Sequence, residues 1–144
     1  MRILPAFIAL ACLGCSGHPN PEEKALISKV ESMVSLPKGG GKLKCYERHY
    51  VLLEGKEIDD YVGFPLSERS GRSQLMVGQY RFGGRPGVYW AKRAKDLPPE
   101  IMDGGCDDIS VFHLVGDPET SILAKCSPTI AGVPPDEIVP PHTC

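Results

Sequence analysis

The sequence lacks an excess of basic residues, a long hydrophobic run and any catalytic or metal-binding spacing. It has 16 lysines and arginines against 18 aspartates and glutamates, and a net charge of −2 gives no general attraction for nucleic acid or anionic lipid. The apolar run at residues 3–11 is too short to cross a bilayer. Neither H-E-x-x-H nor a paired C-x-x-C follows Cys15, and the glycines at 39–41 lack the spacing of a phosphate loop. We therefore expect no metal, cofactor or nucleic-acid partner.

The composition is that of an ordinary globular protein, with 42% hydrophobic and 24% charged residues. A chain of 144 residues is long enough for one domain with a single core and too short for two. We expect this domain at residues 21–126, after a short linker at 15–20. Residues 127–144 form a proline-rich tail, because proline at this density removes backbone donors and blocks helix.

The N-terminus has the features of an export signal. Arg2 supplies a positive charge, residues 3–11 form a short apolar region, and Leu13-Gly14-Cys15 resembles the lipobox of bacterial lipoproteins. The resemblance implies that residues 1–14 are a signal peptide, that Cys15 carries a lipid and that the protein lies in the periplasm. Ser16 resembles the residue that directs lipoproteins to the outer membrane. Cleavage before Cys12, and secretion as a soluble protein, are the alternatives.

The cysteine count agrees with an oxidising compartment. Removal of Cys12 and lipidation of Cys15 leave an even set of four, namely Cys45, Cys106, Cys126 and Cys144. A turn near residues 117–118 would place Cys126 about one strand step from Cys106, so a bond between these two is reachable. Cys45 and Cys144 would then form the second bridge, although four cysteines allow three pairings.

A helix is predicted from Pro21 to about Pro37. Asn20 can cap it, Pro21 suits the first helical position, and Glu22 and Glu23 favour the positive end of the helix dipole. Apolar residues then recur at helical spacing along one face. The predicted helix ends where Leu36 precedes a proline.

The rest of the domain has the composition of β-strands. We predict one strand at residues 44–54, a hairpin of strands 74–82 and 88–92 around a loop at 83–87, and a hairpin of strands 109–115 and 120–126. Residues 58–72 are predicted to be a loop with Tyr61, Val62 and Phe64 turned inward. Asp96 is predicted to cap a helical turn at residues 97–102, and Gly104-Gly105 to allow a sharp return.

These elements predict an α+β domain in which an N-terminal amphipathic helix packs on a four- to five-stranded antiparallel sheet. By analogy alone, the layout is cystatin-like.

Two groups of residues could carry chemistry. Cys45 and His49 lie on one strand but about 13 Å apart, so we interpret Cys45 as a disulfide cysteine and not as a nucleophile. His113 could meet Asp107, Asp108 or Glu47 if the strands bring them together, which would suit a small hydrolase or isomerase. A buried, hydrogen-bonded histidine is the ordinary alternative, and we expect no enzyme.

Tyrosine, tryptophan and arginine gather on the predicted strands and on the loop at 83–87. These residue types anchor protein interfaces, although packing within the core and on the sheet faces is the more common reason for such a set. The candidate interface residues are Tyr46, Arg48, Tyr80, Arg85, Tyr89 and Trp90.

The segments G-R-P-G at 84–87 and D-L-P-P-E-I-M-D-G-G-C at 96–106 resemble small exported proteobacterial proteins to which no function is assigned. The resemblance covers residues 44–126 and implies no catalytic residue. We expect a lipid-anchored, non-enzymatic protein that binds an envelope partner, as an inhibitor or immunity protein does. A purely structural envelope protein is the alternative.

Overall fold

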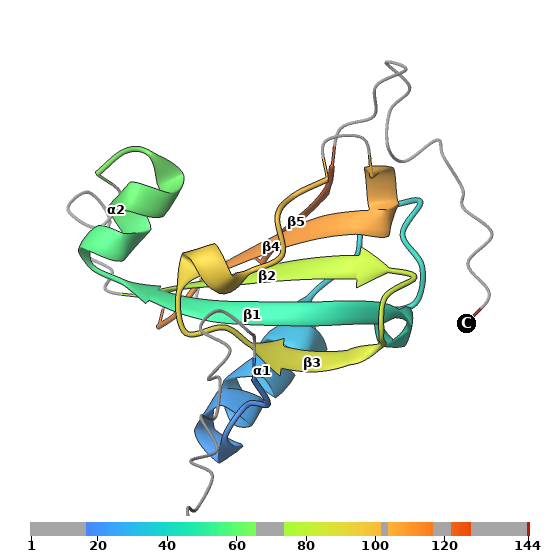
Figure 1. Ribbon diagram of the computed structural model, residues 1–144, viewed down its shortest axis with the longest axis horizontal. Coiled ribbons are helices and arrows are strands. Elements are labelled where there is room, and N and C mark those ends of the chain that lie inside the picture. The colour runs from blue at the N-terminus through green and yellow to red at the C-terminus, as the bar shows by residue number, and fades with distance from the viewer. Residues whose placement is uncertain (1–16, 66–73, 102–103, 117–121, 128–143) are drawn as a thin grey trace, which may run out of the picture.

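A computed structural model describes residues 17–65, 74–101, 104–116, 122–127 and 144. It shows an α+β fold in which the helix α1 (Pro21–Met33) packs on one face of a five-stranded sheet, as the sequence predicts (Figure 1). The segment at 93–101 crosses the opposite face of the sheet. The sheet therefore has one face covered by a helix and one covered only in part.

The helix α1 begins where the sequence predicts. The Asn20 side chain accepts a hydrogen bond from the Glu23 backbone N–H at 2.9 Å, and the Glu23 carboxylate accepts from the Asn20 N–H at 2.7 Å, which completes a capping box. Ile27 and Val30 are buried against the sheet. The helix ends at Met33, earlier than predicted, because Val34 already has extended backbone angles.

The sheet has the strand order β3-β1-β2-β4-β5. Its strands are β1 (Tyr46–Glu54), β2 (Gln74–Phe82), β3 (Gly87–Trp90), β4 (Asp108–Leu114) and β5 (Leu123–Cys126). Three of the four neighbouring pairs are antiparallel, and β1 with β3 is parallel, so the sheet is mixed and not wholly antiparallel. The pairing of β4 with β5 confirms the second predicted hairpin, whose turn at 117–121 lies outside the described residues.

The first predicted hairpin is wrong. Both strands form, but β2 already has β1 on one side and β4 on the other, so neither of its edges can accept β3. The chain instead passes to the outer edge of β1. β2 runs antiparallel to β1, and the chain reverses direction once more between β2 and β3. The strand β3 therefore runs parallel to β1.

The predicted loop after β1 contains a helix, α2 (Lys56–Val62). Gly55, with φ of 49°, turns the chain out of β1, and Gly63, with φ of 80°, ends the helix in the left-handed conformation. Ile58 is the buried residue of α2. Tyr61 and Phe64 are 39% and 49% exposed, so the prediction that they turn inward is wrong.

The helical turn predicted after Asp96 is also wrong. A 3₁₀ turn, η2 (Ala94–Asp96), ends at Asp96 instead, and the Asp96 carboxylate accepts two hydrogen bonds from Arg93 at 3.1 and 3.3 Å. Leu97 is extended because two prolines follow it. The predicted sharp return is present at Gly105, whose φ is 55°. It begins the 3₁₀ turn η3 (Gly105–Asp107) that leads into β4.

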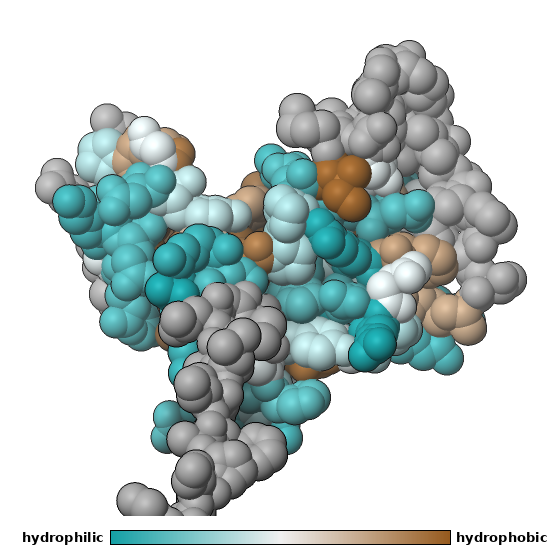
Figure 2. Space-filling model, viewed as in Figure 1, coloured by the Kyte–Doolittle hydropathy of each residue, from teal (hydrophilic) through white to brown (hydrophobic). Residues whose placement is uncertain are grey.

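The two faces of the sheet carry two separate cores. Tyr46, Tyr50 and Tyr80 pack with α1 on one face. Val51 and Val77 pack with Ile58 and the partly buried Leu97 on the other. Figure 2 views this second face, most of which is hydrophilic.

Side-chain hydrogen bonds also join α1 to the sheet. The Glu31 carboxylate accepts from the Tyr50 hydroxyl at 2.9 Å and forms an ion pair with Arg48 at 2.7 Å. The Tyr50 and Tyr80 hydroxyls share a further hydrogen bond. Burial is the largest cause that raises the pKa of both tyrosines, so both stay neutral donors.

The predicted linker is attached to the domain over residues 17–20. Gly17 exchanges two backbone hydrogen bonds with Trp90, at 2.7 and 2.8 Å, and Pro19 is buried. Of the predicted tail, Ser127 is buried and Cys144 is bonded to Cys45, while residues 128–143 lie outside the described part.

Candidate functional site

A row of polar side chains crosses the sheet on the face opposite α1. The row contains one residue from each strand, because each is the cross-strand partner of the next: Tyr89, His49, Gln79, Ser110 and Lys125. Cross-strand partners point to the same face of a sheet, so these side chains lie side by side. His49, Gln79 and Ser110 in the middle of the row are buried, and Lys125 at its end is exposed.

The neighbouring rows on this face differ in character. One contains Glu47, Arg81 and Asp108, and the other contains apolar residues such as Val77 and Phe112. The face is therefore polar towards the start of β1 and apolar towards α2. We place the candidate site at this polar set, which lies at the end of the face away from α2.

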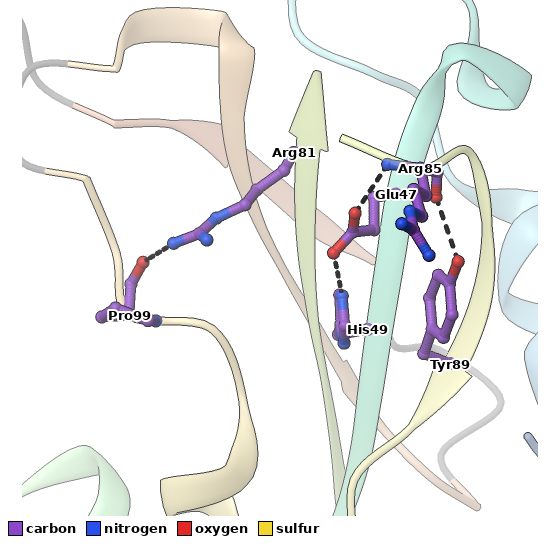
Figure 3. Close-up of polar contacts among 6 residues, drawn as sticks. All are labelled: Glu47, His49, Arg81, Arg85, Tyr89 and Pro99. Atoms are coloured by element: carbon purple, nitrogen blue, oxygen red, sulfur yellow. Dashed lines mark hydrogen bonds and ion pairs between the residues drawn. The ribbon is translucent and has the colours of Figure 1, made fainter. Parts of the chain in front are cut away.

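Glu47 is the centre of the polar set (Figure 3). One carboxylate oxygen lies 2.6 Å from the Nε2 atom of His49, and the other accepts a hydrogen bond from the backbone N–H of Arg85 at 2.7 Å. The Tyr89 hydroxyl donates to the Arg85 carbonyl oxygen at 3.2 Å. The backbone of the loop between β2 and β3 is thus held at both sides of Arg85.

The surroundings of Glu47 favour its charged form. Burial would raise the pKa of Glu47, but the hydrogen bonds from His49 and the Arg85 N–H, with the charges of His49 and Arg81, lower it below the ordinary value. Arg81 also donates a hydrogen bond to the carbonyl oxygen of Pro99, which ties the crossing segment to the sheet. Glu47 therefore acts as a fixed anionic acceptor that orients His49 and the loop.

Three aromatic rings stack beside Glu47. The ring centroids of His49 and Tyr89 are 4.8 Å apart with an interplanar angle of 18°, and His18 stacks on Tyr89 at 6.3 Å. Gly84 allows the loop to approach, because a Cβ atom there would lie 2.3 Å from a Glu47 carboxylate oxygen. The loop and these rings form a fixed surface at the β3 edge of the sheet.

The predicted interface residues fall into two groups. Tyr46 and Tyr80 are fully buried on the α1 face, so neither is available to a partner, and Arg48 is held there by Glu31. Trp90 packs against the same core. Only Arg85, which is exposed, and Tyr89, which is partly exposed, lie together on an open surface. Strand alternation separates the two groups, because odd-numbered and even-numbered residues of β1 point to opposite faces.

The structure does not bring His113 together with Asp108. His113 is a cross-strand neighbour of Met76, on the α1 face, whereas Asp108 lies on the opposite face. The Asp108 carboxylate is fully buried and accepts hydrogen bonds from Gln79, the Ile101 N–H and Ser127. It holds the crossing segment and the end of β5 to the sheet.

His113 itself is buried, and neither of its ring nitrogens has a hydrogen-bond partner among the described residues. Burial lowers the pKa of His113, and the charge of Lys29 lowers it further. The imidazole is therefore neutral near pH 7. Asp107 is exposed at the turn before β4.

The four predicted disulfide cysteines form two bridges, Cys45–Cys144 and Cys106–Cys126. This confirms that Cys45 is a disulfide cysteine and not a nucleophile. His49, the candidate partner of such a nucleophile, contacts the Glu47 carboxylate. Two disulfides are typical of an oxidising, non-cytoplasmic environment. The predicted lipidation site, Cys15, lies outside the described residues.

Sequence reasoning missed the pairing of Glu47 with His49. The signal was present, because residues two apart on a strand share a face and opposite charges at that spacing can interact. The third member, Tyr89, depends on the parallel pairing of β3 with β1, which the sequence did not indicate.

Within the described ranges, no group of three histidine, cysteine, aspartate or glutamate residues could hold a metal ion. None of the helices in that part of the chain combines the length and apolarity needed to cross a bilayer. Comparison of the chain with protein-family models, curated proteins and solved structures gives no match.

Proposed function

We propose that this protein is a small exported, lipid-anchored periplasmic protein that binds another envelope protein without catalysing a reaction. The observation that carries the proposal is Arg85, an exposed arginine on a loop whose backbone is held on both sides. None of the described residues forms a hydrogen bond or ion pair with its guanidinium. Arginine and tyrosine are among the residue types enriched at the hot spots of protein interfaces.

A fixed loop supports binding because less conformational entropy is lost when the complex forms. Here Glu47 fixes the Arg85 N–H, and Tyr89 fixes the Arg85 carbonyl. The guanidinium can form two parallel hydrogen bonds with a carboxylate, so the partner surface should present an aspartate or glutamate. An inhibitor or immunity protein acts by contacts of this kind.

The compartment supports the same proposal. Both disulfides need an oxidising environment, and the first residues of the chain have the pattern of a lipoprotein signal with Cys15 at the cleavage site. Ser16 favours the outer membrane. The intact mass of the mature protein tests this part: a chain that starts at Cys15, with added acyl chains and four cysteines in bridges, is expected. A mature chain that starts elsewhere or lacks acyl chains would contradict lipid anchoring.

Site-specific photo-crosslinking tests the binding surface. A crosslinker in place of Pro86, which is exposed beside Arg85 and leaves the arginine intact, is expected to capture an envelope protein, and a crosslinker at Lys56 on α2 is not. The captured protein is then purified, and its affinity for the lipid-free mature chain is measured by calorimetry. Arg85→Ala and Tyr89→Ala should each weaken binding by about fivefold or more, as interface anchors do.

Lys56→Ala is the matched control, since Lys56 is also an exposed basic residue but lies on α2. It should leave the affinity unchanged. Equal affinities for the Arg85→Ala variant and the unchanged protein, with both folded by circular dichroism, would refute the assignment of this surface.

A further inference from the structure

A groove lies on the same face of the sheet, away from the Arg85 loop. It has a volume of about 330 Å³ and lies between Tyr61 of α2, the segment at 94–100 and the strands β2, β4 and β5. Figure 2 shows the surface hollowed between α2 and the end of the molecule formed by β4 and β5. This volume is at the small end of ligand pockets, so it suits one terminal residue and not a large cofactor.

The floor of the groove offers hydrogen-bonding groups of both kinds. Gln79 and Ser110 line it and are only 4% and 5% exposed. The Ser110 hydroxyl donates to the Gln79 side-chain oxygen at 3.1 Å, and the Gln79 amide nitrogen donates to Asp108. This leaves the second Gln79 N–H as a donor and the Ser110 oxygen as an acceptor. An amide group, which has one N–H and one carbonyl, matches this pair.

The remaining lining is apolar on one side and charged at the rim. Phe112 and Leu97 supply partly buried apolar surface beside the polar floor. The exposed Lys95 and Lys125 stand at the rim, and the Lys125 ammonium lies 5.8 Å from the centre of the Phe112 ring. Glu100 also lines the groove, and its carboxylate lies 3.3 Å from the Ser127 hydroxyl oxygen.

We propose that this groove binds the C-terminal residue of a peptide chain that ends in an apolar side chain. The carboxylate lies near Lys95 and Lys125, the amide meets Gln79 and Ser110, and the apolar side chain packs on Phe112 and Leu97. Two lysines against one glutamate give the rim a net positive charge, which is complementary to a carboxylate. The groove contains neither Arg85 nor Tyr89, so this site is independent of the protein-binding surface proposed above.

The test is a titration of the mature, disulfide-bonded chain, labelled with ¹⁵N, by the peptide acetyl-Ala-Ala-Phe. We expect millimolar binding, with backbone amide shifts at residues 79, 97, 110 and 112. The same peptide with a C-terminal carboxamide should bind roughly tenfold more weakly or worse, because it lacks the charged partner of the lysines.

Lys95→Gln and Lys125→Gln should each weaken binding of the acid by about twofold to fivefold, as expected for exposed ion pairs. Lys92→Gln is the control, since Lys92 is exposed on the same stretch of chain but does not line the groove. Equal binding of acid and carboxamide, shifts confined to residues outside the groove, or no shift at about 10 mM peptide would each overturn the proposal.

Discussion

The two disulfides should contribute unequally to stability, because they close loops of different length. Cys106 and Cys126 are 20 residues apart, and Cys45 and Cys144 are 99 apart. The chain-entropy relation gives about 3.3 kcal/mol for the short loop and about 4.7 kcal/mol for the long one at 25 °C. Removal of the long-range bridge should therefore cost about 1.4 kcal/mol more, which is a factor of about ten in the unfolding equilibrium.

The perturbation is a double replacement, Cys45→Ala with Cys144→Ala, compared with Cys106→Ala and Cys126→Ala. Alanine suits the test because Cys45 and Cys106 are buried and a new hydroxyl there would add its own cost. The Cys106–Cys126 bridge joins segments that strand pairing already holds together, since Cys126 is the cross-strand partner of Ile109. Its loss should therefore act mainly by raising the conformational entropy of the unfolded chain.

Urea unfolding followed by circular dichroism and by the fluorescence of the single tryptophan, Trp90, measures both variants. Free energies extrapolated to water are compared, because loss of a bridge also expands the unfolded state and changes the slope. The unchanged protein, unfolded with and without reductant, is the control. A Cys45/Cys144 variant that is more stable than the Cys106/Cys126 variant would refute the loop-entropy reasoning.

Two further predictions concern buried polar groups. Burial and the charge of Lys29 lower the pKa of His113, so its contribution to stability is present above about pH 6.5, the ordinary value of histidine, and falls as the pH drops below that value. A pH series of urea unfolding curves should show this loss of stability. The loss at low pH should be smaller in the His113→Gln variant. An unchanged pH dependence in that variant would contradict the assignment. Asp108→Asn should lower the free energy of unfolding by about 1–3 kcal/mol, because its donors lose a charged acceptor, whereas the exposed Asp60→Asn should change it by less than about 0.5 kcal/mol. Equal effects of the two asparagine variants, measured by urea unfolding, would show that the Asp108 hydrogen bonds add nothing to stability.

Local sequence was sufficient where a short stretch fixes its own structure. Asn20, Pro21 and Glu23 fix the start of α1, because capping uses atoms within one turn. Alternation of side chains located β1, β2 and β4 to within two residues. The helix α2 was missed because a seven-residue helix with one buried apolar residue has almost no periodic signal.

Local sequence was not sufficient to predict the candidate site. The proximity of Arg85, Tyr89 and Glu47 could not be predicted from their spacing, because it depends on which edge of the sheet β3 joins. The groove likewise depends on α2 and on the crossing segment, and the structure of both was predicted wrongly from the sequence.

The sequence by itself determined the α+β class, the N-terminal helix, the strands and the even set of four cysteines, because each follows from short-range patterns or from a count. It also supplied the export signal and Cys15, which remain predictions. Only the tertiary structure decided that β3 runs parallel to β1, that Tyr46 and Tyr80 are buried, and that His113 and Asp108 lie on opposite faces. These features depend on competition among strands for the edges of one sheet, and that competition is settled by contacts between residues far apart in the chain.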